Sequence, residues 1–415
     1  MKILVIVQYW YPFEDSGQPI YGGVFKDLLQ KGHQITILTA FPFFRKGFPE
    51  KWAEYRGKLY QKDTWQGATV IRTYVFAPRY RSEKLALFFR GLNFLSFFLS
   101  SVVAGLFLPK PDLVLTPSYP PLLSGLSARI ISIVKRTSYI YSFQDVFPDN
   151  AAAAGLIKNT ALLKLLNKLG QYVYRHAGHL LVISNTMKQV LRDKGLAAES
   201  ITVIPNYCDT EFIKPGSRDN QFAREHDLLE KFVVMFAGNI GLVQDTGSII
   251  KAAEILKDYH DILFVFVGRG EKKENIEQMV KHLDLANVNF ITFQPLQKMP
   301  DVWATADVGL VTLQKGISSY AVPSKTYGIM ASGRPVLAMI DEGSEVWHMV
   351  QESQCGLCVP PESPTLLAEA VLQLHRNSQE LGDMGKKARA YVVQHYQREN
   401  ISSQYESLFL KLIER

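Results

Sequence analysis

The chain has 415 residues, of which 47% are hydrophobic, so it is long and apolar enough to bury the cores of two ordinary domains. A formal net charge of +7 favours an anionic partner, such as a nucleotide or a membrane surface. The sequence contains no tight Lys/Arg run and no zinc-finger spacing, so no nucleic acid partner is expected. Its three cysteines make no disulfide framework, which is typical of a reducing cytoplasm.

The first half of the chain alternates short apolar runs with helical patterns. Strands are predicted at residues 3–9, 34–40, 68–75, 112–118, 138–143 and 179–184. Helices are expected near residues 20–31, 85–107, 121–134, 161–176 and 185–194. This alternation indicates an α/β protein with a parallel, doubly wound sheet.

A domain junction is expected near residues 201–215, where the segment 201–216 contains two prolines and a glycine and precedes a polar stretch. A second alternating series follows. Its predicted strands are residues 232–238, 262–268, 288–293, 308–313, 335–340 and 356–360. Beyond residue 362 the pattern is helical, and residues 401–415 are amphipathic.

The stretch from Ser318 to Val336 is the best candidate for an anion site. Pro323 fits the first turn of a helix predicted at residues 324–331. Free amides at residues 321–325 and the charge of Lys325 would hold a phosphate there. An ordinary strand-to-helix junction with a surface lysine is the alternative interpretation.

Other loops that follow predicted strands carry glycines or carboxylates. Gly17 follows the first strand, and a glycine-rich turn at Gly238 and Gly241 leads into a helix expected from about residue 246. Asp145 lies just past a strand end and is the better chemical candidate, whereas Asp149 could cap the next helix.

Three more acidic residues follow the strand at residues 335–340, namely Asp341, Glu342 and Glu345. Carboxylates at the carboxyl edge of a sheet can accept hydrogen bonds from sugar or ribose hydroxyls. Capping of the next helix is the alternative role.

Residues 85–108 form the strongest apolar run, interrupted by Arg90, Asn93 and several serines. A membrane-spanning helix, a buried helix and a helix partly inserted into a membrane surface all remain open. Nearby basic residues support the last alternative, namely Arg79, Arg81, Lys84 and Arg90. An aromatic loop also precedes the run and contains Phe41, Phe43, Phe44, Phe48 and Trp52.

Taken in order, several segments resemble the retaining nucleotide-sugar glycosyltransferases of family 4, which have the GT-B fold. The resemblance covers nearly the whole chain and is carried by KILVIVQYWYP, QDVFPD, LLVISNTM, FAGNIGLVQDTGSII, FVGRGEKK and VPSKTYGIMASGRPVLA. Within the family, the chain is most similar to bacterial enzymes that build colanic acid, O-antigen and related surface polysaccharides. The segments are more specific in combination than any one of them is alone.

The resemblance implies two Rossmann-like domains facing each other across a cleft. Residues 1–212 would bind the acceptor, residues 213–394 would bind the nucleotide sugar, and a helix at 395–415 would pack back on the first domain. Asp145 would lie near the reacting sugar and the acceptor. The implied nucleotide-sugar ligands are Gly17, Asn239, Gly241, Gln244, Gly268, Arg269, Ser324 and Lys325.

The chain departs from the family pattern at several positions: Asn239 and Gln244 replace an arginine and a lysine, Gln144 stands where many members have a histidine, and two glutamates are missing. Tyr320 and Gly328 stand where the wider family has glutamates that contact the donor sugar and the ribose. By the resemblance, Tyr320 would lie beside the donor sugar but offers no carboxylate to it, and Glu342 or Glu345 would replace the contact to the ribose.

The implied function is transfer of a hexosyl or N-acetylhexosaminyl group, with retention, from a UDP- or GDP-sugar to a polyprenyl-linked saccharide. No metal and no cofactor are expected, because helix amides and Lys325 would stabilise the leaving diphosphate and no Asp-x-Asp motif occurs. The expected location is cytoplasmic, peripheral on the inner face of the membrane. Alternatives are a non-catalytic GT-B partner in a polysaccharide assembly complex and a nucleotide-sugar epimerase.

Overall fold

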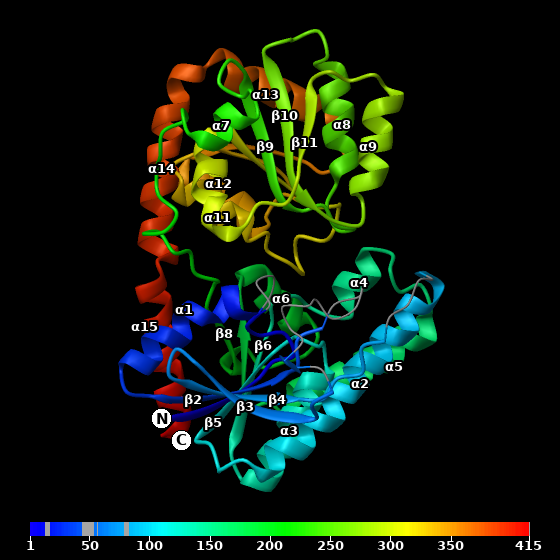
Figure 1. Ribbon diagram of the computed structural model, residues 1–415, viewed down its shortest axis with the longest axis vertical. Helices are drawn as coiled ribbons and strands as arrows, with labels where there is room; N and C mark the ends of the chain where they lie inside the picture. The colour runs from blue at the N-terminus through cyan, green and yellow to red at the C-terminus, as the bar shows by residue number, and fades with distance from the viewer. Residues whose placement is uncertain (13–16, 44–53, 56, 79–82, 415) are drawn as a thin grey trace. The chain divides into compact units, whose positions relative to one another are not determined.

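The computed structural model describes residues 1–12, 17–43, 54–55, 57–78 and 83–414, with the backbone alone at 17–19 and 83–87. The chain divides into two compact units (Figure 1). Unit 1 comprises Met1–Asp149, Ile157–Pro205 and Glu399–Arg415, and unit 2 comprises Asn150–Leu156 and Asn206–Arg398. Among the predicted membrane-surface residues, Phe44, Phe48, Trp52, Arg79, Arg81 and the side chain of Lys84 lie outside the described part.

Unit 1 is built on an eight-stranded sheet in the order β3-β4-β2-β1-β5-β6-β7-β8. Its strands are β1 (Lys2–Ile6), β2 (Gln34–Ala40), β3 (Tyr60–Trp65), β4 (Ala68–Thr73), β5 (Leu113–Pro117), β6 (Ser138–Ser142), β7 (His179–Val182) and β8 (Ile201–Val203). Its helices are α1 (Gly17–Gln30), α2 (Glu83–Phe107), α3 (Leu123–Lys135), α5 (Thr160–Arg175), α6 (Asn185–Asp193) and α15 (Arg398–Ile413). The six strands predicted for this half all form.

The sheet of unit 1 carries an edge strand that the apolar pattern did not predict. Strand β3, with the sequence YQKDTW, pairs antiparallel with β4, whereas the other strand pairs of this sheet are parallel. A two-residue turn at Gln66 and Gly67, with φ of 48° and 95°, joins the two strands. β3 is polar because an edge strand can keep one face in solvent, so it lacks the apolar run that marks the central strands.

Helix α2 has one packed face and one exposed face. Ser101 Oγ lies 3.0 Å from Ser127 Oγ of α3. At Gly105, a side-chain Cβ would meet Ile131 of α3 at 2.3 Å, so glycine is needed for this close approach. The opposite face exposes large apolar residues at intervals of four, Leu95, Leu99, Val103 and Phe107.

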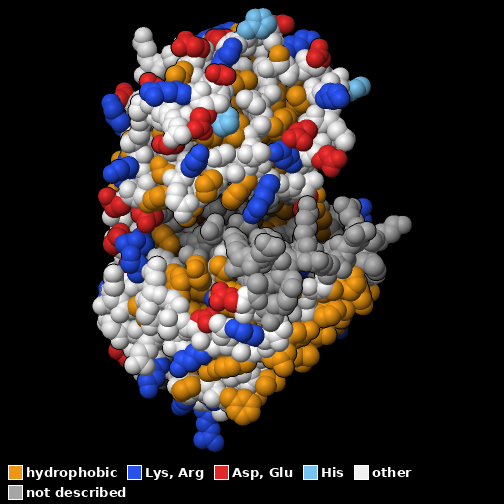
Figure 2. Space-filling view, in the orientation of Figure 1, with side chains coloured by type: hydrophobic (Ala, Val, Ile, Leu, Met, Phe, Trp, Pro, Cys, Tyr) orange, Lys and Arg blue, Asp and Glu red, His pale blue; other side chains and the backbone are white. Residues whose placement is uncertain are grey.

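The exposed face of α2 belongs to a band of hydrophobic side chains at the lower right of Figure 2. By length and composition alone, Phe88–Phe107 could cross a membrane, and 22% of its most apolar window is buried in the fold. The buried-helix interpretation therefore holds for one face of α2 only.

The C-terminal helix α15 packs on unit 1, as expected. Ser402 Oγ donates to Asp27 Oδ2 of α1 at 2.7 Å, and Tyr405 meets Tyr21 of α1 edge to face. Glu406 pairs with Lys31 at 2.5 Å. The end of the chain thus completes the domain formed by its beginning.

Unit 2 contains a six-stranded, wholly parallel sheet in the order β11-β10-β9-β12-β13-β14. Its strands are β9 (Phe232–Asn239), β10 (Ile262–Arg269), β11 (Val288–Ile291), β12 (Val308–Thr312), β13 (Val336–Met339) and β14 (Gly356–Val359). Its helices are α4 (Asp149–Ala153), α7 (Gln221–Glu225), α8 (Thr246–Ile255), α9 (Lys273–His282), α10 (Met299–Thr305), α11 (Lys325–Ala331), α12 (Glu345–Ser353), α13 (Pro364–Arg376) and α14 (Ser378–Tyr396). All six predicted strands form.

The strand order of unit 2 places a topological switch point between β9 and β12. From β9 the chain adds β10 and β11 on one side, and then β12, β13 and β14 on the other. In such doubly wound sheets, ligands bind outside the carboxyl ends of the strands at this reversal. The topology alone therefore directs attention to the loops that follow β9 and β12.

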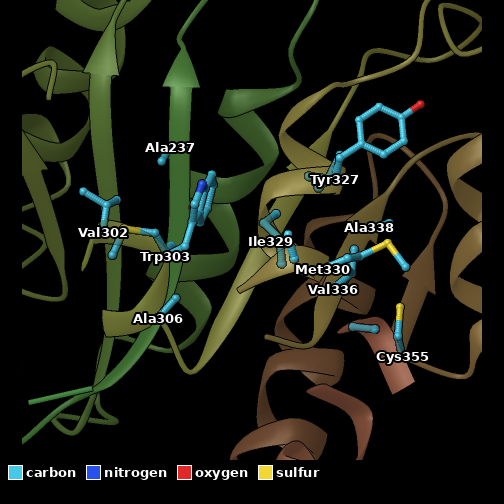
Figure 3. Close-up of a cluster of buried hydrophobic side chains, with 14 of the residues drawn as sticks. Ala237, Val302, Trp303, Ala306, Tyr327, Ile329, Met330, Val336, Ala338 and Cys355 are labelled. Carbon is cyan, nitrogen blue, oxygen red and sulfur yellow. The ribbon is translucent and has the colours of Figure 1, made fainter. Parts of the chain in front are cut away.

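Both faces of this sheet are buried, which explains the continuous apolar runs of its strands. Alternate residues of β9 enter two cores: Val234 and Phe236 join one, while Met235 and Ala237 join the other. Figure 3 shows part of the second core, with Trp303 of α10 beside β9 and Ile329 of α11 nearby. Helix α11 is thereby anchored against β12, where Ile329 packs on Gly309.

Candidate functional site

The carboxyl ends of β9 and β10 are closely packed glycine segments. Gly238 pairs with Gly268, and Asn239 pairs with Arg269. A Cβ atom at Gly268 would lie 2.0 Å from the carbonyl oxygen of Gly238, so no larger residue fits. Gly238 and Gly268 have φ of 129° and 153°, a backbone conformation that favours glycine. The result is a backbone rim free of side chains, which a ligand can approach closely.

Lys325 projects from the start of α11 to this rim. A Cβ atom at Gly238 would lie 3.5 Å from Lys325 Cε and 3.7 Å from Nζ. The Nζ atom lies 3.3 Å from the centre of the Phe236 ring. Although Lys325 as a whole is only half-buried, Nζ is shielded from solvent and has no hydrogen-bond partner among the described residues. A cationic group is therefore held at the switch point without an anion.

Burial lowers the pKa of Lys325 from 10.5 to about 7. A ring face stabilises an ammonium by about 0.5 to 2 kcal/mol, which is too little to offset the loss of hydration. An anionic ligand beside Nζ would favour the charged form and raise the pKa again. The ammonium is thus destabilised in the free protein and would be stabilised by a bound phosphate.

The loop after β9 is closed by its own side chains. Gln244 Oε1 accepts a hydrogen bond from the amide of Gly241 at 2.8 Å, and Lys272 Nζ donates to the Gln244 carbonyl at 2.8 Å. Asp245 caps α8 by accepting from the amide of Ser248. The predicted ligands Asn239, Gly241 and Gln244 therefore form one compact loop at the switch point, with Asn239 exposed at its tip.

The predicted helix of the anion site forms, but it is only seven residues long. Its first amides are already used: Thr326 donates to the Pro323 carbonyl and Tyr327 to the Ser324 carbonyl. The amide of Tyr320 donates to the carbonyl of Ile317. These bonded amides flank the range 321–325, whose free amides stay a prediction, and the dipole of so short a helix contributes less than the charge of Lys325.

At Gly328, the side chain of Trp303 occupies the space that a carboxylate would need. A Cβ atom there would lie 3.0 Å from Trp303 Nε1, and both residues are buried. The position that carries a glutamate in the wider family is therefore a glycine that packs against Trp303 in the core of unit 2. A side chain at position 328 would therefore have to displace the indole of Trp303.

Three acidic residues follow β13, and they have different roles. Asp341 accepts hydrogen bonds from the Gly316 amide at 2.9 and 3.0 Å, which fixes the loop after β12. Glu342 is exposed, and Glu345 begins α12, whose N-cap is Ser344. Helix capping, the alternative interpretation, is thus performed by the serine, so the carboxylates of Glu342 and Glu345 are not needed for it.

At the end of β10, the predicted ligand Arg269 stacks on an aromatic ring. Its guanidinium carbon lies 4.4 Å from the centre of the Phe293 ring, which gives the exposed arginine a defined position. Within the described ranges, no three His, Cys, Asp or Glu side chains gather closely enough to hold a metal ion.

In unit 1, Tyr21 near the start of α1 contacts the segment that precedes Asp145. Gly17 begins α1, and Tyr21 follows one turn later. Gln144 Nε2 donates to the Tyr21 oxygen at 2.8 Å, and Tyr21 in turn lies 3.0 Å from Ser142 Oγ. These contacts hold the start of α1 against the loop that carries the half-buried Asp145.

The negative charge of Asp145 affects the pKa of a nearby tyrosine. The pKa of Tyr119 is raised well above its usual value, first by burial and then by the charge of Asp145. Tyr119 follows β5, next to the β1–β5 switch point of this sheet, where its carbonyl accepts from the Gln8 amide at 3.1 Å. The sequence placed Asp145 at a strand end, and the structure adds that it neighbours the switch point of unit 1.

Three residues of the unit 2 site were not predicted: Phe236, Lys272 and Trp303. Phe236 and Trp303 look like ordinary core residues in the sequence, because their partners come from distant segments. Lys272 offered a signal, since it follows the glycine pair of GRGEKK after a predicted strand.

Comparisons with known proteins agree with this architecture. The profile described as Glycosyltransferase Family 4 matches residues 24–212, and the profile described as Glycosyl transferases group 1 matches residues 217–391. The chain is 29% identical to a probable glycosyltransferase, WbjE, of Pseudomonas aeruginosa, over 76% of this chain and 79% of that protein. It is 26% identical to the putative colanic acid biosynthesis glycosyl transferase WcaI of Escherichia coli, over 98% of both chains.

Among solved structures, HepE of Anabaena in complex with UDP superposes with a TM-score of 0.73 at 15% identity, covering 99% of this chain and 100% of HepE. The same protein in complex with UDP-glucose gives a TM-score of 0.72 at 16% identity, over 98% and 99% of the two chains. At these identities the likeness shows the fold. The chain therefore belongs to glycosyltransferase family 4, has the GT-B fold and is a glycosyltransferase with relatives in bacterial polysaccharide biosynthesis.

Proposed function

We propose that this glycosyltransferase moves a hexosyl or N-acetylhexosaminyl group from a UDP- or GDP-sugar to a lipid-linked saccharide, with retention and without a metal ion. The single observation that carries the proposal is the buried amino group of Lys325 at the switch point of unit 2, which has no hydrogen-bond partner among the residues that the structure describes. A nucleoside diphosphate would supply the missing anion. HepE, a structural neighbour, was solved with UDP and with UDP-glucose.

Lys325 would act on the leaving group. As the bond between the anomeric carbon and the diphosphate oxygen breaks, negative charge grows on that oxygen, and an ammonium already free of water stabilises it strongly. The backbone rim at Gly238 and Gly268 lets the diphosphate come close to Nζ. One fixed cation thus supplies charge that many transferases obtain from a metal.

Retention requires the acceptor oxygen to attack from the face that the diphosphate leaves. The acceptor hydroxyl would form the new bond to the anomeric carbon and pass its proton to the departing phosphate oxygen, so no enzyme nucleophile is needed. Asp145 would position the acceptor or stabilise the positive charge at the sugar. Gln144 and Tyr21 would hold the Asp145 loop in place.

The acceptor and the membrane would meet unit 1 along α2. Three residues of the exposed row, Leu99, Val103 and Phe107, line one side of an apolar pocket of about 600 Å³ together with Leu59. Arg90, on the same helix, is exposed and lies over the Phe94 ring. An apolar face with a basic residue suits a lipid surface and the polyprenyl chain of the acceptor, and it supports a peripheral location on the cytoplasmic face.

A thermal-shift screen tests the proposal. The purified protein is heated with UDP, GDP, dTDP and common UDP- and GDP-sugars, each with magnesium or with EDTA. Stabilisation by one nucleotide and its sugars, retained in EDTA, is the expected result and identifies the donor class. No shift with any of them would contradict donor binding and favour the non-catalytic partner, the reading that the absent glutamates motivate.

A further inference from the structure

Unit 1 contains a second, polar pocket whose role the donor site does not explain. It has a volume of about 490 Å³ and is lined by Tyr11, Tyr55, Lys62, Asp63, Thr64 and Arg72. We call it the Arg72 pocket. It is large enough for a single sugar ring, and it lies at the edge of the sheet formed by β3 and β4.

Arg72 is almost entirely buried, with 2% of its side chain exposed. Its Nε donates to Asp63 Oδ2 at 2.5 Å, while Asp63 Oδ1 accepts from Gln61 Nε2 at 2.6 Å. The guanidinium carbon lies 5.0 Å from the centre of the Tyr55 ring. Asp63 and Tyr55 together hold the plane of the guanidinium in one orientation.

The outer nitrogens of Arg72, Nη1 and Nη2, have no hydrogen-bond acceptor among the described residues. Arg72 lines the pocket, so a ligand that fills the pocket can reach these donors. Two parallel N–H groups with no acceptor match the two oxygens of a carboxylate or a phosphate. Asp63 bonds to Arg72 through Nε and accepts from Gln61 on its other oxygen, which leaves Nη1 and Nη2 available to a ligand.

Other groups of the pocket suit the same ligand. Lys62 adds an exposed positive charge at the edge strand. Burial raises the pKa of Tyr55, so its hydroxyl remains a donor at neutral pH. Arg72, Lys62 and Asp63 leave the lining with one net positive charge, which favours an anion over a neutral sugar.

The pocket is distant from the proposed catalytic carboxylate. Between β4, which carries Arg72, and β6, which precedes Asp145, the sheet order gives four strand spacings. At about 4.8 Å each, this is roughly 19 Å, farther than one sugar ring spans. An anion bound here would belong to a part of the acceptor several units away from the hydroxyl that reacts.

We propose that the Arg72 pocket is an oxyanion subsite for the acceptor, in which Nη1 and Nη2 of Arg72 bind an acidic group of the lipid-linked saccharide. The proposal rests on the proposed function. The acidic group is the carboxylate of an acidic sugar or the phosphate that joins the saccharide to its carrier. The two sources share the same recognition chemistry, and the experiment separates them.

The experiment follows the side-chain Nε–Hε signal of Arg72 by NMR in the full-length protein. Because this group donates to Asp63, its signal is expected apart from those of exposed arginines, and its absence in Arg72→Lys assigns it. The protein is titrated with sodium glucuronate, inorganic diphosphate, glucose and sodium acetate. A shift with glucuronate alone identifies an acidic sugar, and a shift with diphosphate alone identifies the carrier phosphate.

Arg72→Lys keeps the charge but loses the two-nitrogen fork, so affinity for the active anion, measured by titration calorimetry because the variant lacks the NMR signal, should fall about tenfold. The matched control, Arg192→Lys at an exposed position of α6, should bind as the wild type does. UDP-glucose binding, measured in the same samples, reports separately on unit 2. If UDP-glucose binds while neither anion moves the Arg72 signal beyond acetate, the subsite is refuted and the donor site stands.

Discussion

Replacing Lys325 with methionine should make the free protein more stable and the donor bind less well. Methionine has a similar length and carries no charge, so it can fill the space beside Phe236 and Gly238. A pKa lowered from 10.5 to about 7 means that the charged lysine costs the folded state about 5 kcal/mol, at 1.36 kcal/mol per pH unit.

The gain depends on pH. Below pH 7 the lysine is charged in both the folded and the unfolded state, so the full cost is present and Lys325→Met should gain up to about 5 kcal/mol at pH 6. Above pH 7 the folded state is already neutral, and the gain should fall to about 2 kcal/mol at pH 9. Urea unfolding at pH 6 and pH 9 measures both values, with exposed Lys251→Met as the control.

The same variant should bind the donor at least about tenfold more weakly, because a charge-assisted phosphate contact contributes about 1.5 to 3 kcal/mol. Titration calorimetry with the nucleotide sugar found in the thermal-shift screen measures this loss. The contrary result is that Lys325→Met is no more stable than the wild type and binds the donor equally well. That result would refute a buried Lys325 amino group that binds the donor at the switch point.

Three further predictions concern packing and membrane contact. Gly268→Ala should lower the free energy of unfolding by about 3 kcal/mol, because its Cβ would lie 2.0 Å from the Gly238 carbonyl; unchanged urea unfolding would contradict this contact. Gly328→Glu, which restores a family carboxylate, should lose about 1 to 3 kcal/mol of stability against Trp303 and should not tighten nucleotide binding; tighter binding in calorimetry would show that the indole yields. Phe107→Ser on α2, where the residue is 87% exposed, should leave unfolding unchanged and reduce sedimentation with anionic liposomes about tenfold, and equal sedimentation would remove α2 from the membrane surface.

The central strands were predictable because parallel strands that are buried on both faces consist of continuous apolar runs. VVMFA of β9 and LVLTP of β5 are examples. Most helices were predictable as the segments between these runs. Strand β3 escaped prediction because its residues are polar and only the turn at Gln66 and Gly67 marks the hairpin. An edge strand forms because it pairs with the neighbouring strand, and a local sequence pattern contains no information about that pairing.

Lys325 could be proposed as a phosphate ligand from its place after a strand and before a helix. Its burial against Phe236 could not, because that contact joins residues 89 positions apart and depends on the order of β9 and β12 in the sheet. The same limit hid Trp303, whose indole fills the space at Gly328. Arg72 gave no signal at all, since a single arginine in a strand pattern is usually exposed.

The most direct test of the account is the number of protons taken up when the donor binds. Calorimetry at pH 8, in buffers with different enthalpies of ionisation, measures this number for the nucleotide sugar identified by the thermal-shift screen. With a pKa of about 7, Lys325 is about nine-tenths neutral in the free protein at pH 8, and a bound diphosphate should charge it. We expect the wild type to take up about 0.9 proton and Lys325→Met to take up none. Binding without proton uptake, or equal uptake in the two proteins, would contradict the claim that Lys325 holds the donor diphosphate.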